Sequence, residues 1–352
     1  MSKKYVKVSH LALSVGLFTA SFSGSALAAG ELHLYNWSNY FPPSLLELYE
    51  KETGTKVTID SYASEDDLLA KLQAGGGGYD VIFPGASTLG VMVEKGMLAN
   101  AGINKMENFN NLLAPFQTIA GDENREYSAP YMWGTTGFTY DPASVPGNSL
   151  EESWKEVFEP RAELKGKIAM LNEMIDVWNS AAYYKGIDKC TEDPAEAQQI
   201  LDLLLAQKPD VKLYSSEGTI DRMIAGEVPL HMQWNGAAHR VKAKKPDVVY
   251  VYPKEGTSFW VDNMAIPKDS PNIDEAKAFI NWMMRPDIAA EASNYTGYSN
   301  AVKGSGEFLK EELKADPAVN TPESYGDRLR AYKACSPKSK DLREKVWTKL
   351  KS

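Results

Sequence analysis

Strand and helix patterns alternate along the first third of the chain. Hydrophobic and polar residues alternate at 32–36 and 56–60, and residues 79–83 form a short apolar run, which is typical of three strands. A helical pattern follows each strand, and Ser64-x-x-Asp67 before the second helix has the spacing of a capping box. Ser87 is in position to cap the third helix. This order predicts an α/β domain with a mainly parallel sheet.

A second series of strands and helices follows residues 135–138, which have the pattern of a segment crossing between domains. The expected strands are 167–171, 212–214 and 230–234, and the expected helices are 176–184, 194–206 and 274–284. A length of 352 residues fits two domains. Because neither a long linker nor an internal repeat separates the two series, we expect strands rather than a flexible tether to join the domains.

The N-terminal segment has the pattern of a secretory signal peptide. Lys3, Lys4 and Lys7 precede a mostly apolar run of small residues from about 11 to 28, and Ala26-Leu27-Ala28 fits the small-x-small cleavage rule. A membrane anchor is the alternative, but the run is shorter than about 20 residues and holds several Ser and Gly. We therefore expect cleavage after Ala28 and an exported, soluble product without a lipid anchor.

Charge and cysteine content narrow the classes of partner. The 47 acidic and 38 basic residues give a net charge of -9. Loss of the signal peptide removes three lysines and no acidic residue, so the mature chain is more acidic still. An acidic chain repels phosphate backbones, so we expect no nucleic-acid partner, whereas a cationic or neutral small ligand is allowed. Two cysteines are too few for a disulfide scaffold. Cys190 and Cys335 either pair or remain separate thiols, and the sequence leaves both open.

The familiar motifs of enzymes and metal sites are missing from the sequence. It contains no CxxC, HExxH, GxSxG or P-loop motif. His33, His231 and His239 remain after processing, and they are not spaced as metal ligands. We therefore expect a protein that is not an enzyme and has neither a metal nor a cofactor.

Tryptophans stand beside polar or acidic residues at three predicted strand ends, at 37–40, 234–236 and 259–262. Open α/β sheets bind ligands at the carboxyl ends of their strands. Tryptophan faces attract cations, and a carboxylate beside them can hold an ammonium group. Glu173 and Asp176 add two acids at the start of a predicted helix. Taken singly, each tryptophan is better read as core filler and each acid as a solvated surface charge, and only the repeated pattern favours a ligand site.

Together with longer segments, these residues resemble the spermidine/putrescine-binding family of periplasmic proteins that serve ABC importers. The resemblance covers nearly the whole mature chain, and its landmarks are residues 35–40, 78–84, 130–137, 233–236, 253–256, 259–262, 284–287 and 347–349. It implies an α/β, type II periplasmic binding protein fold. Each of its two lobes has a mainly parallel sheet flanked by helices, and the ligand cleft lies between the lobes. The implied division is a signal peptide at 1–28, lobe one at 29–137 plus 263–300, and lobe two at 138–262 plus 301–352.

The resemblance also implies a set of ligand-binding residues. Two acids would take one amine end, a third acid another, and aromatic residues would form the walls. The implied residues are Trp37, Ser38, Asn39, Tyr40, Ser87, Glu173, Asp176, Trp234, Trp260, Asp262, Tyr298 and Cys335. The chain departs from the family pattern at four positions, with Gly85 for Ser, Asn39 for an acid, Ala237 for Asp, and Cys335 for Gln. The missing Asp at position 237 argues against a strict putrescine binder.

The resemblance implies that a monomer captures a polyamine in the periplasm by closing its lobes and delivers it to an ABC permease in the inner membrane. Which amine binds stays open. One alternative is a ferric-iron-binding protein of similar architecture, for which the neighbouring Tyr183 and Tyr184 would supply ligands. The other is a secreted enzyme acting on amines or sugars, with Glu173 and Asp176 as general acid and base.

Overall fold

The computed structural model describes residues 1–2, 30–75, 77–331 and 333–352. Apart from residues 1 and 2, the predicted signal peptide lies outside these residues, and so does its cleavage point. In the part of the chain that is described, no helix combines the length and apolar character needed to cross a membrane.

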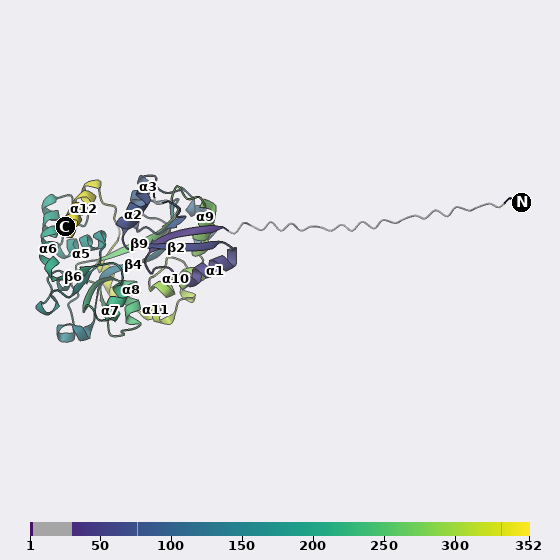
Figure 1. Cartoon of the computed structure of the whole chain (residues 1–352). Coiled ribbons are helices and arrows are strands. Elements are labelled where there is room, and N and C mark those ends of the chain that lie inside the picture. The colour runs from purple at the N-terminus through teal and green to yellow at the C-terminus, as the bar shows by residue number, and fades with distance from the viewer. Residues whose placement is uncertain (3–29, 76, 332) are drawn as a thin grey trace.

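Strands and helices alternate through most of the chain, as the hydrophobic pattern predicts (Figure 1). The strands are β1 Glu31–Trp37, β2 Lys56–Tyr62, β3 Val81–Ile82, β4 Ser128–Tyr140, β5 Ile168–Met170, β6 Val211–Tyr214, β7 Leu230–Trp234, β8 Val249–Val251, β9 Thr257–Ala265 and β10 Leu329–Arg330. The α-helices are α1 Pro43–Thr53, α2 Glu65–Gln73, α3 Ala86–Glu94, α4 Lys155–Phe158, α5 Met174–Lys185, α6 Pro194–Gln207, α7 Thr219–Ile224, α8 Asn235–Lys242, α9 Ile273–Met283, α10 Pro286–Thr296, α11 Glu311–Ala315 and α12 Pro337–Lys351.

Two long strands join two parallel groups of strands. The sheet order is β2-β1-β3-β9-β4-β7-β5-β6, while β8 pairs with β4 and β10 pairs with β9. Strand β1 is parallel to β2 and β3, and β5 is parallel to β6 and β7, which confirms the predicted parallel sheets. Between the two groups, β4 and β9 run antiparallel, and β4 is also antiparallel to β7. The chain therefore passes between the two groups in regular strands rather than in a loose tether.

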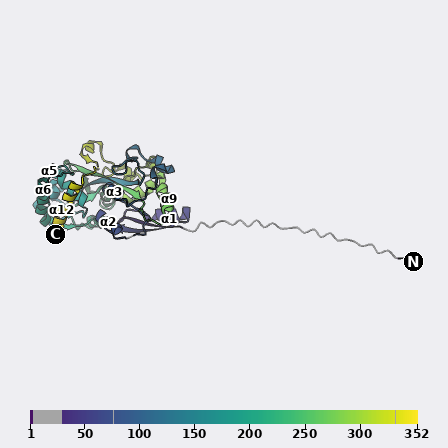
Figure 2. The ribbon, with the colours of Figure 1, turned by 90° about the horizontal axis from the view of Figure 1, so that it is seen from above.

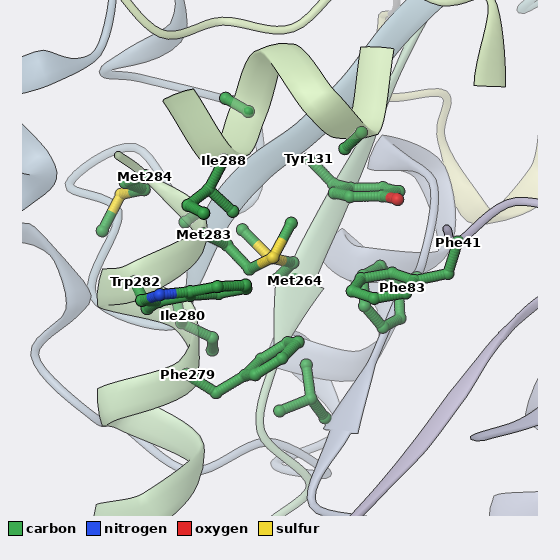
Figure 3. Packing of buried hydrophobic residues seen from close by; sticks show 14 of the residues in the cluster. Phe41, Phe83, Tyr131, Met264, Phe279, Ile280, Trp282, Met283, Met284 and Ile288 are labelled. Atoms are coloured by element: carbon green, nitrogen blue, oxygen red, sulfur yellow. The ribbon is translucent and has the colours of Figure 1, made fainter. Parts of the chain in front are cut away.

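Hydrophobic residues gather on either side of this connection. One core draws on residues 32–132 and 264–302, and Figure 3 shows its packing around Phe41, Phe83, Tyr131 and Phe279. Another draws on residues 138–251 together with Val346 and Leu350 from α12. Figures 1 and 2 place α5, α6 and α12 together at one end of the molecule, with α1 and α9 at the opposite end.

The starts of three helices position polar side chains. The Ser64 hydroxyl accepts the Asp67 N–H at 3.1 Å, so the predicted cap of α2 is confirmed. The predicted capping role of Ser87 is wrong, because α3 begins at Ala86 with Gly85 as its N-cap, so Ser87 lies inside the first turn of the helix. Helix α5 begins directly after Glu173, which keeps that acid at the helix N-terminus.

A disulfide joins Cys190 to Cys335, with their Cα atoms 5.0 Å apart. It links the connection between α5 and α6 to the segment just before α12. The two cysteines are 145 positions apart in the sequence. The question that the sequence left open is therefore settled in favour of pairing.

Candidate functional site

A cavity of about 340 Å³ lies between the two cores, a volume within the usual range for small-molecule sites. Its lining comes from both groups of strands and from the helices that follow them. It includes eleven of the twelve residues named from the sequence, namely Trp37, Ser38, Asn39, Tyr40, Ser87, Glu173, Asp176, Trp234, Trp260, Asp262 and Tyr298.

Cys335 is the residue of that set that does not line the cavity. Its sulfur is bonded to Cys190, and the residue borders a smaller neighbouring hollow together with Lys189 and Arg343. The structure therefore does not bring Cys335 to the cavity lining with the other eleven residues.

Three half-buried tryptophans form the aromatic walls of the cavity. The Trp37 indole donates to the Phe83 carbonyl at 3.0 Å, and the Trp37 and Trp234 rings lie 6.3 Å apart, edge to face. Trp260 contacts the Tyr298 ring at 5.3 Å. All three pack against the cores and also border the cavity, so core packing and ligand contact are not exclusive here.

Gly236 lets Tyr298 reach this wall. A Cβ atom at position 236 would lie 2.5–2.6 Å from three atoms of the Tyr298 ring. Any side chain at that position would push the ring aside. Close packing against Tyr298 therefore explains why a glycine follows Trp234 and Asn235.

Four carboxylates are buried around the cavity, each less than a tenth exposed, namely Glu65, Glu173, Asp176 and Asp262. The groups that donate hydrogen bonds to these carboxylates are uncharged. Asp176 accepts from the Thr136 hydroxyl at 2.7 Å and from the Trp234 indole at 2.8 Å. Asp262 accepts from the Tyr40 hydroxyl at 2.9 Å. The reading of these acids as solvated surface charges is therefore wrong.

Glu65 was missed by the sequence reasoning. It is the first residue of α2 and is followed by Asp66 and Asp67, so it has the pattern of an ordinary solvated first turn. Its backbone N–H donates to Glu173 Oε2 at 3.3 Å, and its Oε1 accepts from the Gly85 N–H at 2.6 Å. No local signal separates this buried acid from its exposed neighbours.

Burial raises the pKa of all four carboxyl groups. The pKa of Glu65 rises to about 7, mainly through loss of hydration. The pKa values of Glu173 and Asp262 lie well above their usual range, first because of burial and then because of the Glu65 charge nearby. In the described part of the chain, no ion pair involves any of the four. Their ionised forms therefore lack a compensating positive charge.

Basic side chains that the sequence reasoning did not single out also border the cavity, namely Lys189, Arg240 and Arg330. Arg240 donates to the backbone oxygen and to Oδ1 of Asn39, at 3.1 Å each. Asn39 adopts a positive φ of 58° and also accepts from the Tyr295 hydroxyl. These contacts connect α8, on one side of the cavity, with the end of β1 and with α10 on the other.

The tyrosine pair proposed for iron packs against protein. Tyr183 and Tyr184 both lie on α5, and Tyr183 is part of the second core. The ring of Tyr184 stacks on Phe158 at 5.8 Å. This packing removes the observation on which the iron alternative depended.

The two-lobed α/β fold with a cavity between its cores defines a solute-binding protein. The chain belongs to the bacterial extracellular solute-binding protein family, whose model matches residues 44–321. Solved relatives share the type II periplasmic binding protein fold, which confirms the predicted fold class. One is the spermidine/putrescine ABC transporter substrate-binding protein PotD of Streptococcus pneumoniae, 28% identical, with a TM-score of 0.74 over 92% of this chain and 99% of that one.

Relatives of known sequence confirm the predicted resemblance to polyamine-binding proteins. The putrescine-binding periplasmic protein SpuD of Pseudomonas aeruginosa is 32% identical, over 94% of this chain and 95% of that protein. The spermidine/putrescine-binding periplasmic protein of Escherichia coli is also 32% identical, over 82% of each chain.

Proposed function

We propose that this protein captures a polyamine or a related cationic amine in the periplasm and delivers it to an ABC importer. The observation that carries the proposal is the set of four buried carboxylates without ion-pair partners among the described residues, around a cavity with tryptophan walls. The names of the relatives support the same ligand class.

The chemistry of the cavity matches an alkyl chain with ammonium groups. Each ammonium group donates charge-assisted hydrogen bonds, worth about 1.5–3 kcal/mol each, to a carboxylate. The methylene chain packs against Trp37, Trp234 and Trp260, whose faces also attract positive charge. Burial raises the pKa values of these acids, and a bound cation would compensate by favouring their ionised forms in place of the lost water.

Closure of two lobes would exclude water from the bound amine. We assign lobe one to residues 29–137 plus 263–300 and lobe two to 138–262 plus 301–352. The membership of the two cores supports this division except at Val302, which belongs to the first core. Strands β4 and β9 would act as the hinge because they run between the cores. The N-terminal pattern supports export with cleavage after Ala28. We further propose that the mature chain acts as a monomer, and the relatives' names support binding rather than catalysis.

A thermal-shift screen of the mature chain tests the proposal. The ligands are putrescine, cadaverine, agmatine, spermidine, spermine and their acetylated forms, with neutral sugars and organic anions as controls. A ligand that binds only the native state adds about 2.7 kcal/mol of stability at a hundredfold excess over its Kd. We expect amines alone to raise the melting temperature. A response to sugars or anions, with none to amines, would overturn the proposal.

A further inference from the structure

Glu65 brings a fourth carboxylate into the cleft from the first turn of α2. Its side chain lines the cavity, and the residue is only 7% exposed. Its Oε1 accepts the Gly85 N–H at 2.6 Å, and the Thr88 hydroxyl lies near enough to favour the ionised carboxylate. Its buried Oε2 nevertheless lacks a donor in hydrogen-bond geometry among the described residues. A buried carboxylate oxygen without a donor is costly unless a ligand supplies one.

Gly85 provides the space for this carboxylate. A Cβ atom at position 85 would lie 2.7 Å from Glu65 Oε1 and 3.4 Å from Asp262 Oδ1. The φ of Gly85 is -66°, which any residue adopts, so it is space rather than backbone conformation that requires glycine. The absence of a side chain at this position allows Glu65 to reach the backbone N–H beside Asp262.

Glu65 is flanked by acids on two sides. Asp262 lies beside it across Gly85, and Glu173 Oε2 accepts its backbone N–H at 3.3 Å. Glu173 lies between β5 and α5, in the other group of strands, and Asp262 lies on β9, which crosses between the cores. A cationic group that enters between them meets negative charge from Glu65 in addition to the acids inferred from the sequence.

We propose that Glu65, in the space left by Gly85, selects amines with three or more positive charges over diamines. The inference rests on the proposed function. A diamine carries two positive charges, and three carboxylates already line the cavity at Glu173, Asp176 and Asp262. Glu65 therefore adds little to the binding of such a ligand. A triamine brings an internal ammonium group with two N–H donors, for which the free Oε2 of Glu65 is the acceptor.

Calorimetric titration of putrescine and spermidine into the mature protein and its variants tests the proposal. Glu65→Gln preserves the shape of the side chain and removes its charge. We expect this change to weaken spermidine binding by about tenfold or more, as for loss of a charge-assisted hydrogen bond, and putrescine binding by about threefold or less. Asp67→Asn is the matched control, because it removes the same charge from an exposed position on the same turn of α2.

Gly85→Ala is a second, independent variant, since its methyl group would displace the Glu65 carboxylate. It should reproduce the selective loss of spermidine binding even where Glu65→Gln fails to fold. Equal losses for both amines, or no loss for either, would overturn the role of Glu65 and leave the proposed function intact. If the unaltered protein binds neither amine nor any other polyamine, the proposed function itself fails.

Discussion

Replacing Asp262 by asparagine should weaken amine binding and at the same time stabilise the ligand-free protein. Asp262 is 8% exposed, and it accepts a hydrogen bond from the uncharged Tyr40 hydroxyl at 2.9 Å. Burial holds its pKa well above the usual range, so its ionised form is unfavourable without a cation. Asparagine keeps the shape and the acceptor for Tyr40 but removes the charge.

The size of the effect follows from the contact that is lost. A hydrogen bond to a charged group is worth about 1.5–3 kcal/mol, which corresponds to roughly a ten- to hundredfold loss of affinity. Calorimetry with the amine that binds best measures this loss, and thermal unfolding without ligand measures the gain in stability.

Asp141→Asn is the matched control for this experiment. Asp141 is similarly buried, but it lies outside the cavity and pairs with Lys245 at 2.6 Å. Removing its charge should lower stability and leave amine affinity unchanged, because it breaks an existing ion pair. If Asp262→Asn behaves like this control, with lower stability and unchanged affinity, Asp262 has a structural role and the assignment of the amine site is refuted.

Three further predictions concern pH, the aromatic wall and closure. Burial raises the pKa of Glu65 from 4.5 in the unfolded chain to about 7, so the contribution of this group to ligand-free stability falls as pH rises from 4.5 to 7. In thermal unfolding, the stability advantage of Glu65→Gln should therefore grow over this pH range. An advantage that does not change with pH would contradict the pKa shift. Trp260→Ala should lower amine affinity several-fold, since a cation–π contact is worth about 0.5–2 kcal/mol; a lower melting temperature with unchanged affinity would instead mark Trp260 as core filler. Arg240→Ala removes the contacts to Asn39 between the two sides of the cavity, so small-angle scattering should show a larger radius of gyration without ligand. Amine affinity should fall by about fivefold or less, because the contact is exposed. An unchanged scattering profile would mean that Arg240 does not hold the two sides together.

The sequence by itself determined the strands of the two parallel groups and several of the helices between them. The strand predicted at 230–234 has the bounds of β7, and the helix predicted at 194–206 differs from α6 by one residue. Ser64 caps α2 as its spacing predicts. These features depend on residues within one strand or one helical turn, so the local pattern of side chains encodes them. The motifs that resemble the polyamine-binding family also identified the tryptophans of the cavity wall and three of its four buried acids.

Only the tertiary structure decided which distant residues share an environment. The hydrogen bond from Tyr40 to Asp262 spans 222 positions, the contact between Glu65 and Glu173 spans 108, and the disulfide spans 145. Glu65 and Asp67 look alike in sequence, yet one is buried beside Gly85 and the other is exposed. The burial that raises the pKa of a carboxyl group comes from the packing of separate segments, and the path of β4 and β9 between the two cores sets that packing.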